Sequence, residues 1–345
     1  MWISREIWQS RLRWNNMWEK QQGQICPEVL YEEGKDGVTI LGCKSVDGIL
    51  ILPDEICGRA VTSVKAYAFS SWQAGKDSRI WRNPQNWKEE GVHPVFGEEV
   101  REVWLPASVS HLGRYAFYRC KNLKKLTLSD RLQEVGGGVF TGCAPEKIEI
   151  YHWEGEKNCL KSIVDEVRFS IDATLVYDTK EVQGRARVLF PEHYEEAVEN
   201  TPARLLFTRH HGSGGYYRQC FYDRTLDYGK YDLAFFHAKA EEERKTTVKL
   251  AVNRLRFPFR LGEEAKKMYT VFVKEKFEQG IQMMLERADI DGIRFLIREI
   301  QPGEEALAAA VRLAGDYRLP EAAGYLLEEK RKQTKGSRLQ ERFSL

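Results

Sequence analysis

The sequence predicts an α+β chain that begins with a short solenoid of strand-containing repeats and ends in an all-helical hairpin domain. Three observations lead to this class: a hydrophobic pattern that recurs every 23 residues, an aromatic-rich middle without a fixed period, and helical periodicity after about residue 245. A chain of 345 residues is also long enough for two or three folding units. The predicted segments are a helical cap over 1–36, a solenoid over 37–152, a mixed aromatic-rich connector over 153–245, helical hairpins over 246–335 and a frayed tail over 336–345.

The bulk composition excludes several kinds of partner. Basic residues exceed acidic ones by only 53 to 51, so the net charge of +2 creates no whole-chain attraction to nucleic acid or to a membrane. No stretch approaches the roughly 18 uninterrupted apolar residues of a membrane span, and the charged N-terminus does not match a signal peptide. The seven cysteines are scattered and form no CxxC pair. We therefore expect a cytoplasmic protein with reduced thiols.

The first 20 residues carry tryptophan, isoleucine and leucine at spacings of four and seven, which predicts an amphipathic helix. We expect this helix to dock on the protein as a cap over the first coil or over the insertion described below. A helix lying on a membrane surface is the alternative interpretation.

The solenoid is predicted from three segments whose sequences align with one another. They are VTSVKAYAF (61–69), VSHLGRYAFYRC (109–120) and LQEVGGGVFTGC (132–143). Short alternating strands with the sequences VWLP, LTLS and IEIY accompany them, with one buried face each. A single unit of this kind cannot bury its own apolar face, so the units must stack on one another.

Stacking at a fixed period places equivalent side chains in rows. Phe117 and Phe140 are 23 residues apart, as are Cys120 and Cys143. We expect Phe69 to join the two phenylalanines in an interior aromatic ladder. The two cysteines form a second row beside it, as stacked thiols.

This combination of motifs resembles a known class of repeats. The pattern LP.SV..LG.YAF..C..L..L.L is similar to the BspA-like bacterial leucine-rich repeats, and the similarity covers roughly residues 37–152. The chain departs from that pattern in having only about four coils, in an insertion after the first coil, and in Val139, which replaces the alanine before the third phenylalanine. The resemblance implies a leucine-rich-repeat solenoid.

Side chains that alternate with the buried ones would line an open sheet face. An exposed Trp104 flanked by charges on that face is typical of a surface that holds a partner. The candidate contact residues on this face are Trp104, Glu102, Lys125, Thr127, Lys147 and Glu149.

The insertion, over about 73–99, supplies further candidates. It contains Trp81 and Trp87 among polar residues and prolines. Insertions leave one face of a solenoid and often bind, and tryptophans are frequent anchors in interfaces. Packing of these tryptophans on the flank of the solenoid is the first interpretation, and a contact loop is the second hypothesis.

The last third of the chain reads as helices joined by short loops. Breaks are expected at Pro258, Gly262, Pro302–Gly303 and Pro320, because proline and glycine favour helix ends. The segments DIDGIRFLI and LPEAAGYLL are offset by 30 residues, which resembles the period of ankyrin repeats, although the TPLH signature of that family is absent.

The connector contains the stretch TRHHGSGGYYRQC (208–220), which is the chemically most suggestive part of the chain. Histidines, a cysteine and an aspartate near it could together supply a nucleophile, a base and an orienting group, or all but the cysteine could bind a metal ion. These residues are His210, His211, Cys220, Asp223 and His237.

No recognised motif organises these residues. The stretch lacks the GxSxG and GxxxxGK[ST] patterns, and side chains of adjacent histidines diverge, so they seldom bind one ion. Gly212, Gly214 and Gly215 instead favour a tight turn, which we interpret as a hinge between the strand-rich and helical halves.

The sequence as a whole therefore predicts a non-enzymatic scaffold or protein–protein interaction protein without cofactor, since both halves have the quasi-linear form that presents binding surfaces. The expected partner is another protein, not nucleic acid or a membrane. The alternative is an enzyme or metal-binding protein with its site around HHGSGG.

Overall fold

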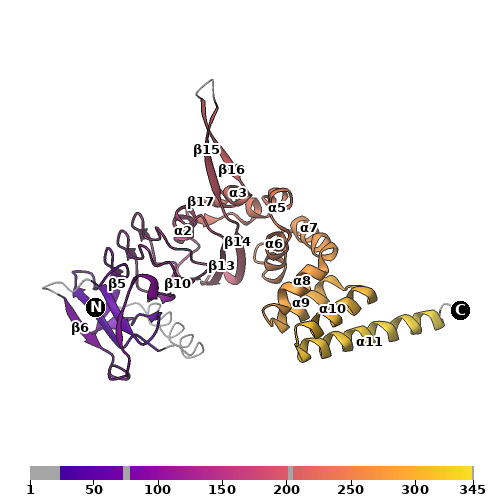
Figure 1. Ribbon diagram of the computed structural model, residues 1–345, viewed down its shortest axis with the longest axis horizontal. Coiled ribbons are helices and arrows are strands. Elements are labelled where there is room, and N and C mark those ends of the chain that lie inside the picture. The colour runs from indigo at the N-terminus through magenta and orange to yellow at the C-terminus, as the bar shows by residue number, and fades with distance from the viewer. Residues whose placement is uncertain (1–23, 73–77, 201–204, 344–345) are drawn as a thin grey trace. The chain divides into compact units, whose positions relative to one another are not determined.

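A computed structural model describes residues 24–72, 78–200 and 205–343 of the chain (Figure 1). The chain divides into two compact units, Met1–Asp227 and Tyr228–Leu345. Unit 1 contains a β-solenoid of about six turns over 38–177, and unit 2 is helical, which confirms the predicted α+β class.

One side of the solenoid is a six-stranded sheet. Its first five strands are parallel and its sixth is antiparallel. The row Leu50, Val103, Leu126, Ile148 and Ala173 crosses the five parallel strands in register, and all five side chains are fully buried. The strands are β3 (Ile49–Ile51), β8 (Glu102–Trp104), β10 (Lys125–Ser129), β12 (Lys147–His152), β13 (Ile171–Asp178) and β14 (Gln183–Phe190).

The other side is an eight-stranded sheet whose strands β2, β5, β9 and β11 are also parallel. Strands β6 and β7 come from the insertion and pair antiparallel with β1 and β2, so the insertion extends this sheet. The strands are β1 (Glu28–Glu33), β2 (Val38–Ser45), β4 (Glu55–Ile56), β5 (Arg59–Val64), β6 (Arg79–Arg82), β7 (His93–Val95), β9 (His111–Leu112) and β11 (Glu134–Val135).

The predicted N-terminal cap differs from the structure at its C-terminal end. Residues Glu28–Glu33 form the strand β1, which pairs with β2, where the sequence suggested part of a helical cap. The helix expected over 1–20 lies outside the described residues.

An aromatic ladder runs through the interior between the two sheets. The ring centroids of Phe69 and Phe117 are 5.1 Å apart, and those of Phe117 and Phe140 are 5.8 Å apart, with nearly parallel planes in both pairs. Beside it, the thiol of Cys120 donates to the carbonyl of Phe69, and that of Cys143 to the carbonyl of Phe117. All seven cysteines lie in the described part of the chain and are free. The predicted ladder and thiol row are therefore confirmed.

The solenoid continues past residue 152, where the sequence placed its end. The helix α2 (Leu160–Glu166) replaces the turn of the earlier coils, and β13 then pairs parallel with β12. The segment EHYEEAVEN (192–200), which follows β14, reads as a helix from its sequence but forms a strand. Strand β15 (Tyr194–Asn200) pairs antiparallel with β16 (Leu205–His211) in a two-stranded ribbon that projects from unit 1 (Figure 1).

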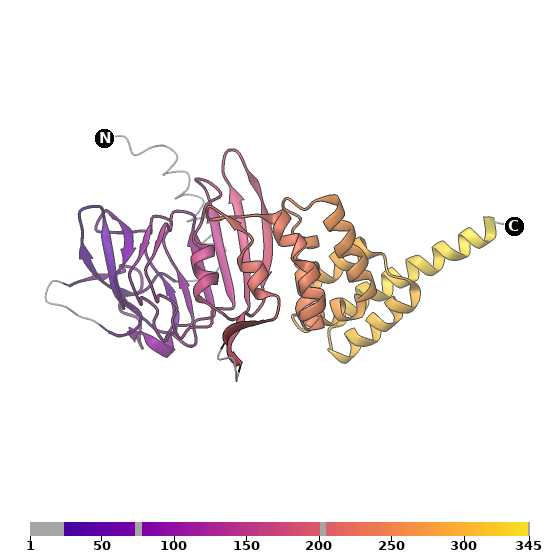
Figure 2. The same ribbon diagram turned by 90° about the horizontal axis from the view of Figure 1, so that it is seen from above.

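Unit 2 consists of helices that pack side by side (orange to yellow in Figure 2). Gly262 and Gly303 precede helices and Pro320 begins one, as predicted. The last helix continues through most of the segment expected to be a frayed tail, and the ankyrin-like period stays a prediction. The helices are α4 (Tyr228–Leu233), α5 (Phe235–Glu241), α6 (Arg244–Arg256), α7 (Glu263–Glu275), α8 (Phe277–Leu285), α9 (Ile290–Ile300), α10 (Glu304–Asp316) and α11 (Pro320–Phe343).

A buried ion pair joins three of these helices. The guanidinium of Arg254, fully buried on α6, donates to both carboxylate oxygens of Asp232 on α4 at 2.7 and 3.0 Å. The hydroxyl of Tyr269 on α7 donates to the same carboxylate at 3.0 Å. Because each partner is satisfied, the pair fixes the packing of α4, α6 and α7 without leaving a buried charge alone.

We predict that Phe117→Ala lowers the free energy of unfolding by about 3–5 kcal/mol, because it removes the middle ring of the ladder and leaves a cavity. Urea unfolding followed by far-UV circular dichroism measures this. Phe169→Ala is the control, since Phe169 is 52% exposed, and it should change stability by less than about 0.5 kcal/mol. Equal effects of the two substitutions would contradict a structural role for the ladder.

A second prediction concerns pH. His152 is fully buried, its Nε2 accepts from the amide of Asn158 at 3.0 Å, and its ring stacks on Tyr177. Burial lowers the pKa of His152 to about 4, whereas an unfolded histidine titrates near 6.5. Folding thus favours the neutral form of His152. The resulting contribution to the free energy of unfolding, about 3 kcal/mol, is fully present above pH 6.5 and is lost as the pH falls toward 4.

The substitution His152→Phe keeps the stacking and removes the titration. Unfolding free energies measured from pH 7 to pH 4 should therefore fall less steeply in this variant than in the original chain. His111→Phe, at an exposed histidine, should leave the slope unchanged. Identical slopes in all three proteins would show that His152 is not held neutral.

Candidate interaction surface

The sheet face proposed from the sequence is more closed than expected. Trp104 is only 5% exposed and Thr127 is fully buried, so the prediction that they lie on an open face is wrong. The ammonium of Lys125 lies 4.7 Å from the centre of the Trp104 ring and 3.4 Å from a carboxylate oxygen of Glu149. The charged side chains of the face thus cover the indole ring.

The remaining predicted residues of this face form one row. Glu102, Lys125 and Lys147 lie opposite one another in β8, β10 and β12. Glu102 and Lys125 are half-buried, and Lys147 is exposed. This row offers a polar rim in place of the aromatic anchor that the sequence suggested.

The two tryptophans of the insertion differ in how exposed they are. Trp81 is half-buried in β6, opposite Val29. Trp87 is 39% exposed, and the cations of Arg82 and Lys88 lie 5.5 and 5.1 Å from its ring. Of the two, Trp87 is the more accessible to a partner.

The HHGSGG stretch is a tight junction inside unit 1. Gly212 has a φ of +74°, and Gly214 begins the five-residue helix α3 (Gly214–Arg218). A β-carbon at Gly214 would lie 2.3 Å from the carbonyl oxygen of Glu192, so only glycine allows this close approach. Because the boundary between the units falls after Asp227, the predicted hinge between the two halves is wrong.

The residues proposed for chemistry near this stretch have separate partners. His211 contacts Glu196 at 3.2 Å, Asp223 forms an ion pair with Lys157, and the thiol of Cys220 donates to a backbone carbonyl. His237 lies in α5 of unit 2, where it is paired with Glu241, and the side chain of His210 lies outside the described part. Among the described residues, no three histidine, cysteine or carboxylate side chains are grouped so that they could hold a metal ion.

Arg218, at the end of α3, links the segments that meet at this junction. It is 6% exposed, and its guanidinium donates to the carbonyls of Val164, Pro191 and Val167 at 2.6–3.0 Å. Burial lowers the pKa of Arg218 to about 10, so it remains charged at neutral pH. One side chain therefore ties α2, the end of β14 and α3 together.

The structure reveals an exposed surface that the sequence reading missed. On one edge of the solenoid, the ring of Tyr67 stacks on that of Tyr115 at 5.2 Å, and Tyr118 packs edge-on against Tyr115 at 5.6 Å. The guanidinium of Arg114 lies 5.8 Å from the Tyr115 ring, and that of Arg119 lies 5.1 Å from the Tyr118 ring. We call these five residues the tyrosine–arginine ridge.

The repeat itself places the ridge on the surface. Tyr67, Tyr115 and Gly138 occupy the same position, two residues before the ladder phenylalanines, and have φ values of +62°, +58° and +72°. This conformation costs a tyrosine on the order of 1–3 kcal/mol. In the next coil a β-carbon at Gly138 would lie 2.2 Å from the Tyr115 ring. Glycine there leaves the space that the ring occupies.

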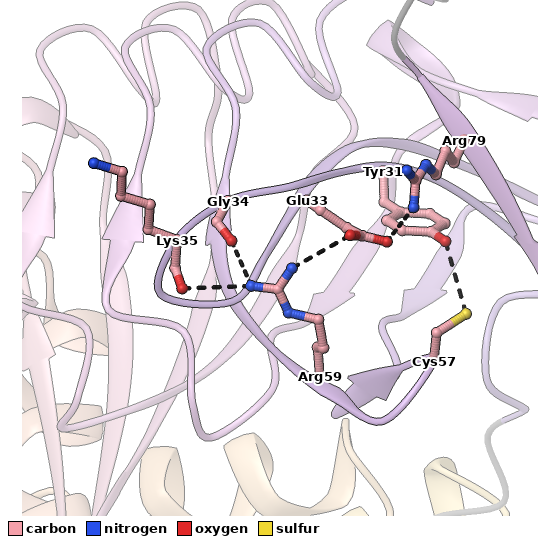
Figure 3. Close-up of polar contacts among 7 residues, drawn as sticks. All are labelled: Tyr31, Glu33, Gly34, Lys35, Cys57, Arg59 and Arg79. Atoms are coloured by element: carbon pink, nitrogen blue, oxygen red, sulfur yellow. Dashed lines mark hydrogen bonds and ion pairs between the residues drawn. The ribbon is translucent and has the colours of Figure 1, made fainter.

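Arginines elsewhere on the same unit are neutralised by the protein itself, as Figure 3 illustrates. Arg59 donates to the backbone carbonyls of Gly34 and Lys35 and to the carboxylate of Glu33. Arg79 forms an ion pair with the other oxygen of Glu33. This cluster closes the turn between β1 and β2, and its charges are used internally.

Two sheets of short parallel strands joined by turns around a phenylalanine ladder define a leucine-rich-repeat type of solenoid. The profile described as a BspA type leucine rich repeat region (6 copies) matches residues 96–167. Among solved structures, a similarity was found to the crystal structure of a T. pallidum leucine-rich repeat protein. The two sequences are 20% identical, and the alignment covers 34% of this chain and 67% of that chain, with a TM-score of 0.17. A comparison with curated proteins gave no match. The chain thus contains a BspA-type leucine-rich repeat region, as its sequence predicted.

Among the described residues, no helix combines the length and the apolar character that crossing a bilayer requires.

The close approach at Gly214 gives a prediction. Gly214→Ala should lower the free energy of unfolding by roughly 1–3 kcal/mol, because the new methyl group meets the backbone at Glu192. Gly155→Ala is the control, since a β-carbon there meets nothing within 4 Å. Thermal melts of both variants test this, and a neutral Gly214→Ala would mean that the glycine has a role other than packing.

Proposed function

We propose that the chain is a non-enzymatic interaction protein that holds another protein through the tyrosine–arginine ridge. The observation that carries this proposal is the exposure of the ridge, since Tyr67 is 39% exposed, Tyr115 and Tyr118 are partly exposed, and both arginines are exposed. Tyrosine and arginine are enriched in protein interfaces and among the residues that dominate binding energy.

The packing of the ridge favours binding for a further reason. Ordering a flexible side chain on association costs about 0.5–1.5 kcal/mol. Here the stacked rings of Tyr67 and Tyr115 and the cation–aromatic pairs already restrict the side chains before a partner arrives. The partner then meets a surface that is largely formed in advance.

An enzyme or metal protein centred on HHGSGG is the alternative function, and it has less support. Its described residues each contact a different neighbour, and His237 belongs to the other compact unit. The glycines have a sufficient structural reason in the contact between Gly214 and Glu192.

The proposal also places the protein in the cytoplasm, where seven free cysteines would stay reduced. Fractionation of cells followed by immunodetection tests this location, and recovery of the protein outside the cell would contradict it.

Substitution of the ridge tyrosines tests the interaction. The immobilised chain should retain a specific partner from a cell extract, and Tyr67→Ala with Tyr118→Ala should weaken that binding by 30-fold or more, as expected when about 2 kcal/mol is lost at the centre of an interface. Trp87→Ala is the matched control, because it removes another exposed aromatic side chain from the same unit. A partner lost on Trp87→Ala and kept by the tyrosine variant would move the binding site to the insertion.

A further inference from the structure

We infer that the segment bound by the ridge is acidic, and that its carboxylates pair with Arg114 and Arg119. This inference rests on the proposed function and adds the chemistry of the partner. It names an acidic, extended segment of a protein as the occupant of the ridge.

The first support is the way in which the two guanidinium groups are held. Each lies close to a tyrosine ring, at 5.8 Å for Arg114 and 5.1 Å for Arg119. A planar guanidinium that packs on a ring keeps donors along its edge, and those donors match the two oxygens of a carboxylate. The aromatic ring thus positions the cation without neutralising its charge.

The second support is that these charges have no acidic partner among the described residues. Neither guanidinium forms an ion pair there, in contrast to nearby cations of the solenoid. Lys65 is paired with Glu32 at 2.7 Å and Lys121 with Glu98 at 2.6 Å. Exposed cations without such a partner can pair with an anion that a bound protein brings.

The acidic side chains of the surrounding coils are already engaged. Glu98 is held by Lys121, and Glu134 contacts His111 at 3.1 Å. Glu166 accepts from the backbone amide of Phe140 at 2.6 Å. Among the described residues, these three carboxylates are therefore not available to Arg114 and Arg119, and that role falls to the proposed partner.

The coil next to the ridge carries glycines where the ridge has tyrosine and arginine. Where the ridge coil has tyrosine and arginine, that coil has Gly138 and Gly142, and a β-carbon at Gly137 would meet nothing within 4 Å. The space at Gly138 is taken by the Tyr115 ring and that at Gly142 by Arg119. The open surface therefore lies at Gly137, the position equivalent to Arg114, where a bound segment can approach.

A protein segment fits this surface better than a nucleic acid does. Nucleic acids are bound by many cations spread along the phosphate backbone, and the chain as a whole carries a net charge of only +2. Lys65 and Lys121, close to the ridge in sequence, are each paired with a glutamate. Two free arginines among tyrosines suit a short acidic stretch with some apolar contact.

The test measures binding of a fluorescein-labelled peptide to the full chain by fluorescence anisotropy at low salt. The peptide has ten residues, mainly glutamate with one central phenylalanine, and the reference peptide has glutamine in place of glutamate. We expect the glutamate peptide to bind at least tenfold more tightly than the reference, and increasing salt to weaken its binding.

The double variant Arg114→Gln/Arg119→Gln should lose at least tenfold in affinity for the glutamate peptide. Arg79→Gln is the matched control, because it removes another exposed arginine of the same unit whose charge is already paired with Glu33, and its affinity should stay within twofold. The double variant Arg114→Lys/Arg119→Lys should fall between these, since lysine keeps the charge but not the planar donors. Circular dichroism verifies that all variants fold.

Several results would overturn the inference. The inference fails if the two peptides bind equally well, or if the Arg114→Gln/Arg119→Gln variant binds the glutamate peptide like the original chain. It also fails if an unstructured RNA of ten nucleotides binds more tightly than the glutamate peptide. Suppose that one of these results is found, but Tyr67→Ala with Tyr118→Ala still abolishes binding of the partner from the cell extract. Then the ridge is an interface, and only the inference that its partner is acidic is wrong. If the tyrosine variants keep that partner as well, the ridge is not an interface.

Discussion

Each coil of this solenoid can bury its apolar face only against the next coil, and the stacking of Phe69, Phe117 and Phe140 makes that contact. Phe117 and Phe140 are 23 positions apart, whereas the insertion separates Phe69 from Phe117 by 48 positions, yet both pairs stack. The strands that flank the last two rings keep a continuous register. Backbone hydrogen bonds follow the same spacing, since the amide of Phe69 donates to Ala116 and that of Phe117 to Val139. The interior ladder therefore determines what lies on the surface of every turn.

The turn two residues before each phenylalanine illustrates this dependence. The backbone there has a positive φ in all three coils, whether the residue is tyrosine or glycine. Glycine meets this demand without strain, whereas the strained Tyr67 and Tyr115 are stacked on each other at 5.2 Å. Since a tyrosine in this position costs stability that glycine would save, an exposed tyrosine pair is better explained by binding than by folding.

The sequence was sufficient for those parts of the fold that repeat. The period identified the ladder, the thiol row of Cys120 and Cys143, and the parallel strands. It failed where pairing with another strand decides the outcome. Tyr194–Asn200 has three glutamates among seven residues, which favours a helix, yet it is a strand because β16 pairs with it. It also failed for Trp104, because alternation shows which way a side chain points and not that Lys125 covers it. The ridge was missed since no local pattern shows that Gly138 makes room for Tyr115.

The arginines of the chain differ in the groups that their guanidinium donors contact. This difference distinguishes arginines that stabilise the fold from arginines that are candidates for binding a partner. Arg218 and Arg254 are buried, and each is satisfied by several carbonyls or by a carboxylate of its own unit. Removing either would leave polar groups unsatisfied in the interior, which marks them as parts of the fold. Arg114 and Arg119 are exposed and are held by aromatic rings that cannot neutralise them. Their loss would cost the fold little, and the proposed acidic partner would give these two arginines beside tyrosine rings a role.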